Sequence, residues 1–247
     1  MLSLEQFNQF LAQVDLADYR NKYQHIKCFE ADMPKSIQAL KSIYEIYWDK
    51  PVKPIPDFEV FYNKYYWTKH MRDLVFEKNE KDIGLCSICL EKGVKARIYR
   101  TWASLITQIQ AAYCCVEVFG FENVFQNEEL DRSGIDILII YKKQKIGLQI
   151  KKQTGRKEIA NRKPLGKEKN EADMMYNLYY YVPDEKDLKN PQYTRDTKNN
   201  KKGEWKEFAK LFGLDESQPY LKILDKGFVV FTTKYFLDLK TKLDNLL

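Results

Sequence analysis

The sequence lacks the features that would place it in a membrane or outside the cell. It contains no uncharged apolar run of about 18 residues, the length that spans a bilayer. Its N-terminal stretch, MLSLEQFNQFLAQVDLADYR, is amphipathic and acidic, which does not fit a signal peptide. Five cysteines without an export signal predict free thiols in a reducing compartment, so we expect a cytoplasmic protein.

Histidine and the common ligand-binding motifs are also scarce. The two histidines lie far apart among apolar and aromatic residues, which argues against a Cys-His or Ser-His-Asp site. Neither GxxxxGK(S/T) nor GxGxxG occurs, so nucleotide-driven chemistry is not expected. Cys86 and Cys89 form a CxxC pair, but Cys114 and Cys115 are adjacent in a predicted helix and poorly placed to complete a zinc site.

Basic residues are abundant, and they are concentrated in the second half of the chain. The net charge is +6, and from Lys142 to Lys169 there are eleven Lys or Arg residues against two acidic ones. Residues 189–206 are basic again. Such a local positive field attracts a polyanion such as nucleic acid. Charge alone would also fit a solvated, lysine-rich surface.

Length and patterning predict a folded α/β protein. The 247 residues, 44% of them hydrophobic, can form one large domain or two modest ones. We expect a mostly helical region over residues 1–95 and, over 96–247, a small mixed β-sheet flanked by helices. Apolar spacing and turn signals predict these elements: helices over 2–24, 34–50, 97–119 and about 171–178, a short strand in FENVF, an acidic turn in NEELD, strands in NLYYYV, YLKIL and GFVVFTT, and a final helix from about Tyr235.

The segment IDILIIYKKQKIGLQIK alternates as a β-hairpin. With a two-residue turn at Lys143 and Gln144, Asp136 lies opposite Lys151, and Gln149 shares their face of the sheet. These three polar side chains would then lie within about 5 to 8 Å of each other. The opposite face is apolar and suited to the core: Ile135, Ile137, Ile139, Leu148 and Ile150.

The polar face of this hairpin suits phosphodiester hydrolysis. Carboxylate and amide oxygens are hard ligands for Mg²⁺, and a lysine can position water and stabilise negative charge. Asp131, five residues before Asp136, could add a carboxylate, and Glu117 is a weaker candidate ligand or outer-shell group. A simple cross-strand ion pair is the structural alternative. The acidic turn before the hairpin and the basic loop after it favour the catalytic interpretation.

At these residues the sequence resembles known nucleases. GID followed some twelve residues later by QIK resembles the PD-(D/E)XK core, in its variant with Gln as the last acidic residue. The runs FNQFLAQVDLADYRNKYQHIK, IYEIYWDK, ARIYRTWASLITQIQAAY, ELDRSGIDILI and LQIKK resemble the TaqI-type restriction endonuclease family, over most of the chain from about Phe7 to Gln153.

The resemblance implies a restriction-endonuclease-like core and a type II restriction endonuclease. Such an enzyme is a Mg²⁺-dependent homodimer that cuts both strands of double-stranded DNA at TCGA, with a cognate methyltransferase as its functional partner. The resemblance also implies that Asp131 and Asp136 are the active-site carboxylates and that Gln149 occupies the position of the usual acidic metal ligand. It assigns the catalytic lysine to the QIKK run, where strand parity favours Lys151 over Lys152.

The basic loop that follows, TGRKEIANRKPLGKEKN, is the candidate for DNA recognition. Arg can read guanine and Asn can read adenine, but most contacts in such interfaces go to phosphates. We therefore expect DNA contacts, without assigned bases, from five residues: Lys152, Arg156, Lys157, Asn161 and Arg162. Two other functions fit the same residues, namely a DNA-binding protein with an inactive nuclease core and a repair nuclease.

Overall fold

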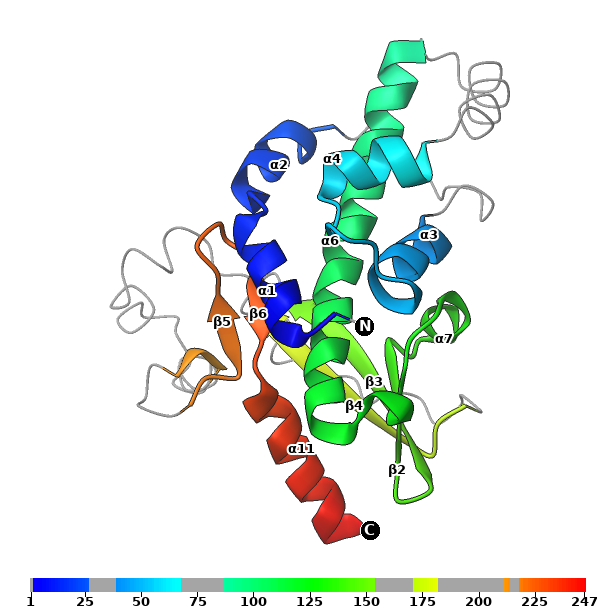
Figure 1. Ribbon diagram of the computed structural model, residues 1–247, viewed down its shortest axis with the longest axis vertical. Helices are drawn as coiled ribbons and strands as arrows, with labels where there is room; N and C mark the ends of the chain where they lie inside the picture. Colours follow the sequence, from blue (N-terminus) through cyan, green and yellow to red (C-terminus); the bar gives the residue numbers. More distant parts are fainter. Residues whose placement is uncertain (1, 27–38, 68–86, 154–170, 182–210, 214–217) are drawn as a thin grey trace, which may run out of the picture. The chain divides into compact units, whose positions relative to one another are not determined.

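The computed structural model describes residues 2–26, 39–67, 87–153, 171–181, 211–213 and 218–247 (Figure 1). The chain forms two compact units, residues 1–109 with 225–228, and residues 110–224 with 229–247. The boundary falls within helix α6 (Ser87–Phe119). The domain boundary expected after residue 95 also lies in this helix, and it stays a prediction. None of the described helices is long and apolar enough to cross a membrane.

The N-terminal unit is helical, as predicted, and its core is aromatic. Besides the first part of α6, its elements are α1 (Leu4–Gln13), α2 (Leu16–Tyr23), α3 (Leu40–Tyr44) with a π-helical turn (Glu45–Asp49), and α4 (Phe58–Val60) with a π-helical turn (Phe61–Tyr66). Trp102 is fully buried, with four aromatic ring centroids 5.5 to 6.3 Å away: Tyr19, Tyr47, Phe58 and Tyr99. Its indole N–H donates to the Tyr47 hydroxyl at 2.9 Å, so this aromatic core leaves the indole N–H satisfied.

The prediction of one helix over residues 2–24 is wrong, because the structure has two helices there, α1 and α2. Ser3 caps α1 as predicted, in a capping box with Gln6. The chain then leaves the helical conformation at Val14, whose φ is −78° and ψ 115°. The Asp15 carboxylate accepts the backbone N–H of Asp18 at 2.8 Å and starts α2. A second N-cap inside the apolar pattern therefore divides one expected helix into two.

The second unit contains the predicted mixed sheet with flanking helices (Figure 1). Its elements are β1 (Val124–Phe125), α7 (Glu128–Ser133), β2 (Ile137–Tyr141), β3 (Gln144–Gln153), β4 (Met174–Tyr181), β5 (Leu221–Ile223), β6 (Val229–Phe231) and α11 (Thr233–Leu246). The main sheet has the order β1-β2-β3-β4, in which only the pair β3 and β4 is parallel. Strands β5 and β6 form a separate antiparallel pair.

Two local expectations in this unit are wrong. The acidic turn in NEELD belongs to helix α7, which Asn127 caps by accepting the N–H of Leu130 at 2.8 Å. The helix expected around 171–178 is instead mostly strand β4, which pairs with β3 along its whole length. Its alternate side chains at Leu178 and Tyr180 are buried, and aromatic residues favour strands. The pairing with a distant strand outweighs the weak local helical signal.

The β2–β3 hairpin confirms the expected faces but not the expected register. Ile137 lies opposite Leu148, and the turn consists of Lys142 and Lys143 with φ of 48° and 67°. Positive φ at both central residues is the geometry of a tight hairpin turn. The turn therefore comes one residue earlier than expected, and every cross-strand partner moves by two positions. A shift of two keeps the faces unchanged, and the predicted apolar set is buried: Ile135, Ile137, Ile139, Leu148 and Ile150.

A buried glutamine connects the second sheet to helix α6. The Gln110 amide N–H donates to the Phe231 carbonyl at 3.0 Å, and its oxygen accepts the Phe231 N–H at 2.9 Å. The thiol of Cys114 also contacts this carbonyl at 3.4 Å. Cys114 and Cys115 are fully buried, which confirms their packing role, whereas Cys86 of the CxxC pair lies outside the described residues.

Replacing Gln110 with Met should destabilise the protein. The substitution keeps the volume but leaves the buried N–H of Phe231 without its acceptor, at a cost of about 1 to 3 kcal/mol in the free energy of unfolding. Urea denaturation followed by circular dichroism measures the change. Ser104→Ala on the exposed face of the same helix is the control and should be near neutral. Equal stability of the two variants would contradict a structural role for the Gln110 contacts.

Candidate active site

Asp136 lies just before β2 and is held by three hydrogen bonds. Its side chain is almost buried, with 7% of the residue exposed. The carboxylate accepts the backbone N–H of Ile150 at 2.5 Å, and the backbone N–H of Asp136 donates to the Leu148 carbonyl at 2.9 Å. Its own carbonyl accepts a hydrogen bond from the amide of Gln126 at 2.9 Å. The orientation of this carboxylate is therefore set by strand β3 and by the residue that follows β1.

The end of helix α7 brings a second carboxylate to Asp136. The helix ends at Gly134, whose φ of 86° is the left-handed conformation that glycine adopts without strain. The Gly134 N–H donates to the Asp131 carbonyl at 2.9 Å. This turn places the Asp131 carboxyl within hydrogen-bonding reach of the Asp136 carboxyl, and the ammonium of Lys151 is close enough to act on it electrostatically. The structure thus brings these three predicted residues together.

Burial dominates the protonation of Asp136. The pKa of this carboxyl is raised to about 7, mainly by desolvation and also by the Asp131 charge, while the hydrogen bond from the Ile150 N–H and the Lys151 charge act to lower it. The carboxyl is therefore half-protonated near neutral pH. Perturbed carboxyl groups of this kind are concentrated at functional sites. A cation beside it would favour the ionised form.

Gln149 lies next to Asp136 across the hairpin and carries a buried amide oxygen. The register of the hairpin ends with Ile137 opposite Leu148, so Asp136 and Gln149 are the residues that directly follow this last pair on the two strands. The Gln149 side-chain oxygen has no hydrogen-bond partner among the described residues. A water or a cation at this position would satisfy the buried acceptor.

The donor set fits a divalent cation with hard-ligand preference. Mg²⁺ is usually bound by one or two carboxylates and completed by waters and substrate phosphates. Asp136, Asp131 and the Gln149 oxygen match this pattern. A cage of three or more His, Cys, Asp or Glu side chains does not occur in the described part of the chain. The protein alone would thus supply only part of a coordination shell.

Other predicted site residues are not gathered around Asp136. Glu117 is exposed on α6, and Lys152 is exposed one position after Lys151, so it projects to the opposite face of β3. Their roles stay predictions. Four expected DNA contacts lie outside the described residues: Arg156, Lys157, Asn161 and Arg162. Sequence analysis missed Gln126, because its only signal is its proximity in the chain to the acidic segment.

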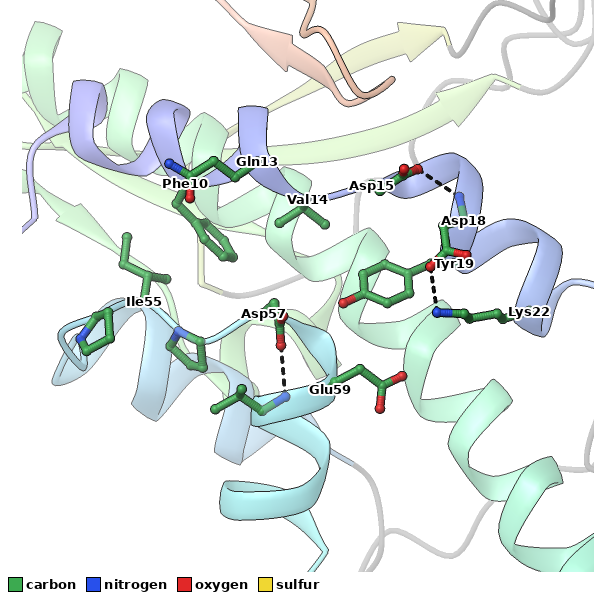
Figure 2. Close-up of a pocket in the computed structure, with 13 residues that line it drawn as sticks. Phe10, Gln13, Val14, Asp15, Asp18, Tyr19, Lys22, Ile55, Asp57 and Glu59 are labelled. Atoms are coloured by element: carbon green, nitrogen blue, oxygen red, sulfur yellow. Dashed lines mark hydrogen bonds and ion pairs between the residues drawn. The ribbon is translucent and has the colours of Figure 1, made fainter.

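The N-terminal unit contains a cavity of about 470 Å³ (Figure 2). Its carboxylates already have structural partners. Asp15 caps α2, Asp57 caps α4 by accepting the Val60 N–H at 2.9 Å, and Asp18 pairs with Lys22 at 2.6 Å. Figure 2 shows these contacts as dashed lines around the cavity. The polar groups stabilise helix ends, and we assign no chemistry to them.

Comparisons with known proteins point to one family. A model of the TaqI restriction endonuclease family matches residues 4–243. The chain is 31% identical over 246 residues to the type II restriction enzyme TthHB8I of Thermus thermophilus, covering 96% of this chain and 86% of that enzyme. It is 37% identical over 165 residues to the type II restriction enzyme TaqI of Thermus aquaticus, covering 63% of this chain and 59% of that enzyme. No solved structure matches significantly.

The architecture and these matches agree. A small mixed sheet with flanking helices and a helical N-terminal region has the form of a restriction-endonuclease-like core, and the relatives are site-specific endonucleases of type II. The chain belongs to the TaqI restriction endonuclease family. It is accordingly a restriction endonuclease whose substrate is DNA.

The stability of the cation-free protein should fall as the pH rises. The Asp136 pKa of about 7 in the folded chain lies above its ordinary value of 3.8. Between these values the folded chain keeps a proton that the unfolded chain has released. The contribution of Asp136 to the free energy of unfolding is therefore complete below pH 4 and is lost by about pH 7. The loss is at most about 4 kcal/mol.

Urea denaturation in EDTA at pH 5 and pH 8 measures this effect. Asp136→Asn is the matched control, because it cannot titrate and should remove this component of the pH dependence. An identical pH dependence in wild type and variant would contradict a raised pKa at Asp136.

Proposed function

We propose that this restriction enzyme requires Mg²⁺ and cuts both strands of duplex DNA at TCGA. The observation that carries the proposal is the polar face at the start of β2, where Asp136, Asp131, Gln149 and Lys151 meet. Carboxylates and an amide oxygen beside one cation match the needs of phosphodiester hydrolysis. The TCGA specificity rests on the family resemblance, and the residues that would read the bases are not assigned.

Each residue of this face would have its own role in the reaction. Asp136 and Asp131 would hold the ion, with the Gln149 oxygen as a further ligand. A bound Mg²⁺ supplies polarisation of the phosphodiester and offsets the negative charge that develops on it. Lys151 would orient the attacking water and stabilise the same charge. The water oxygen would form a bond to phosphorus and lose a proton to solvent, while the bond from phosphorus to the leaving sugar oxygen would break and that oxygen would take up a proton.

The biological setting belongs to the same proposal. A palindromic site has two-fold symmetry, so a homodimer would present one active site to each strand. A cognate methyltransferase would protect the host DNA, and both proteins would act in the cytoplasm. An inactive nuclease core is less well supported, because decay would not be expected to keep all four polar residues together. A repair nuclease would cut lesions in place of a fixed sequence.

Incubation with unmethylated plasmid DNA of known sequence tests the function. With Mg²⁺ we expect discrete fragments that map to TCGA, and with EDTA we expect none. Asp136→Ala should abolish cleavage but keep specific DNA binding in a gel-shift assay with Ca²⁺, because it removes a cation ligand and no phosphate contact. Fragments at another sequence would reject the specificity, a smear would favour a repair or nonspecific nuclease, and intact but shifted DNA would indicate a binding protein.

The two neighbouring lysines should differ in their effect on catalysis. Lys151 faces Asp136, so Lys151→Ala should lower the single-turnover cleavage rate roughly 100-fold or more. Lys152 projects to the other face, so Lys152→Ala should weaken DNA binding and change the rate at saturating enzyme by less than about tenfold. A larger rate loss in Lys152→Ala than in Lys151→Ala would transfer the catalytic role to Lys152.

A further inference from the structure

Asn177 on β4 continues the polar row of the active face by one strand. In the parallel pair of β3 and β4, Asn177 is the register partner of Gln149. Directly partnered residues of neighbouring strands project to the same face of a sheet. Gln149 in turn follows Leu148, the last partner of β2, and Asp136 precedes Ile137, the first residue of β2, so Asp136, Gln149 and Asn177 are neighbours across the three strands.

The side-chain oxygen of Asn177, like that of Gln149, is a buried acceptor without a hydrogen bond within the described part of the chain. A buried acceptor without a partner is unfavourable, because it has lost its hydrogen bonds to water. Two such oxygens at partnered positions, beside an almost buried carboxyl, share one explanation. An ion with its waters beside Asp136 would satisfy both oxygens.

The spacing of the strands determines whether Asn177 could bind the ion directly or only through its waters. Neighbouring strands lie about 4.8 Å apart, so the backbones of residues 136 and 177 are about 10 Å apart across β3. Two side-chain oxygens that both ligate one Mg²⁺ lie much closer together, since each is about 2.1 Å from the ion. Asn177 is therefore suited to the waters around the ion, which Mg²⁺ gives up reluctantly.

We propose that Asn177 is a positioning residue of the cation site, whose side-chain oxygen accepts a hydrogen bond from water in the shell of the ion held by Asp136 and Gln149. The inference rests on the proposed function, because it needs a divalent cation at Asp136. It adds a residue to the site, since the residues predicted from the hairpin include none from β4. The structural alternative is that Asn177 contributes only to the packing of the sheet.

Binding of Mn²⁺ to the full chain, followed by the EPR signal of the free ion at pH 8, tests the proposal without relying on cleavage. Asn177→Leu should weaken Mn²⁺ binding roughly tenfold or more, as loss of an outer-shell partner does. Asn177→Asp should tighten binding, because a carboxylate adds charge to the site. Tyr176→Phe, on the opposite face of β4, is the matched control and should bind as wild type does.

The outcomes separate the inference from the proposed function. If Asp136→Asn loses Mn²⁺ binding while both Asn177 variants bind as wild type does, the inference is overturned and the cation site stands. A loss of stability in urea for Asn177→Leu, with unchanged Mn²⁺ affinity, would overturn the inference and establish the purely structural role instead. If wild type binds no Mn²⁺, alone or with a TCGA duplex, or if Asp136→Asn binds as well as wild type, the proposed cation site fails and the inference fails with it.

Discussion

The hydrogen bond from the Ile150 N–H to the Asp136 carboxylate is the contact on which the polar face depends. It joins the residue before β2 to the middle of β3, at 2.5 Å and away from solvent. Without it, Asp136 would be the first residue of a strand with a rotatable side chain. With it, the carboxylate is fixed beside Gln149, and the short path through Gly134 brings Asp131 to the same place. Preorganised polar groups are what hydrolytic sites require.

Local patterns predicted the parts of the fold that depend on period and on caps. The alternation of apolar residues in the hairpin separated its two faces correctly, because side chains in a strand alternate whatever the register. Ser3 and Gly120 are of residue types that favour helix ends, and they lie at the start of α1 and directly after α6. The register itself was missed, because it depends on a turn formed by Lys142 and Lys143, and lysine is not a residue that signals positive φ.

The polar residues that sequence analysis missed all depend on long-range pairing. Asp136, Gln149 and Lys151 lie within one hairpin, so parity was enough to place them on one face. Gln126 reaches the Asp136 carbonyl only because β1 pairs with β2, and Asn177 joins the row only because β4 pairs in parallel with β3. The segment that contains Asn177 was expected to be partly helical, which hid this placement. Pairing between distant segments is the information that periodicity does not contain.

The raised pKa of Asp136 also bears on what it costs the fold to keep a carboxylate at this position. An almost buried carboxyl that resists ionisation lowers the stability of the cation-free protein above neutral pH. A neutral side chain of the same size would not carry this ionisation cost, but the buried Ile150 N–H would still require an acceptor from it. Asp136 is thus an ionisable residue at a place where burial favours the neutral form and the backbone requires an oxygen.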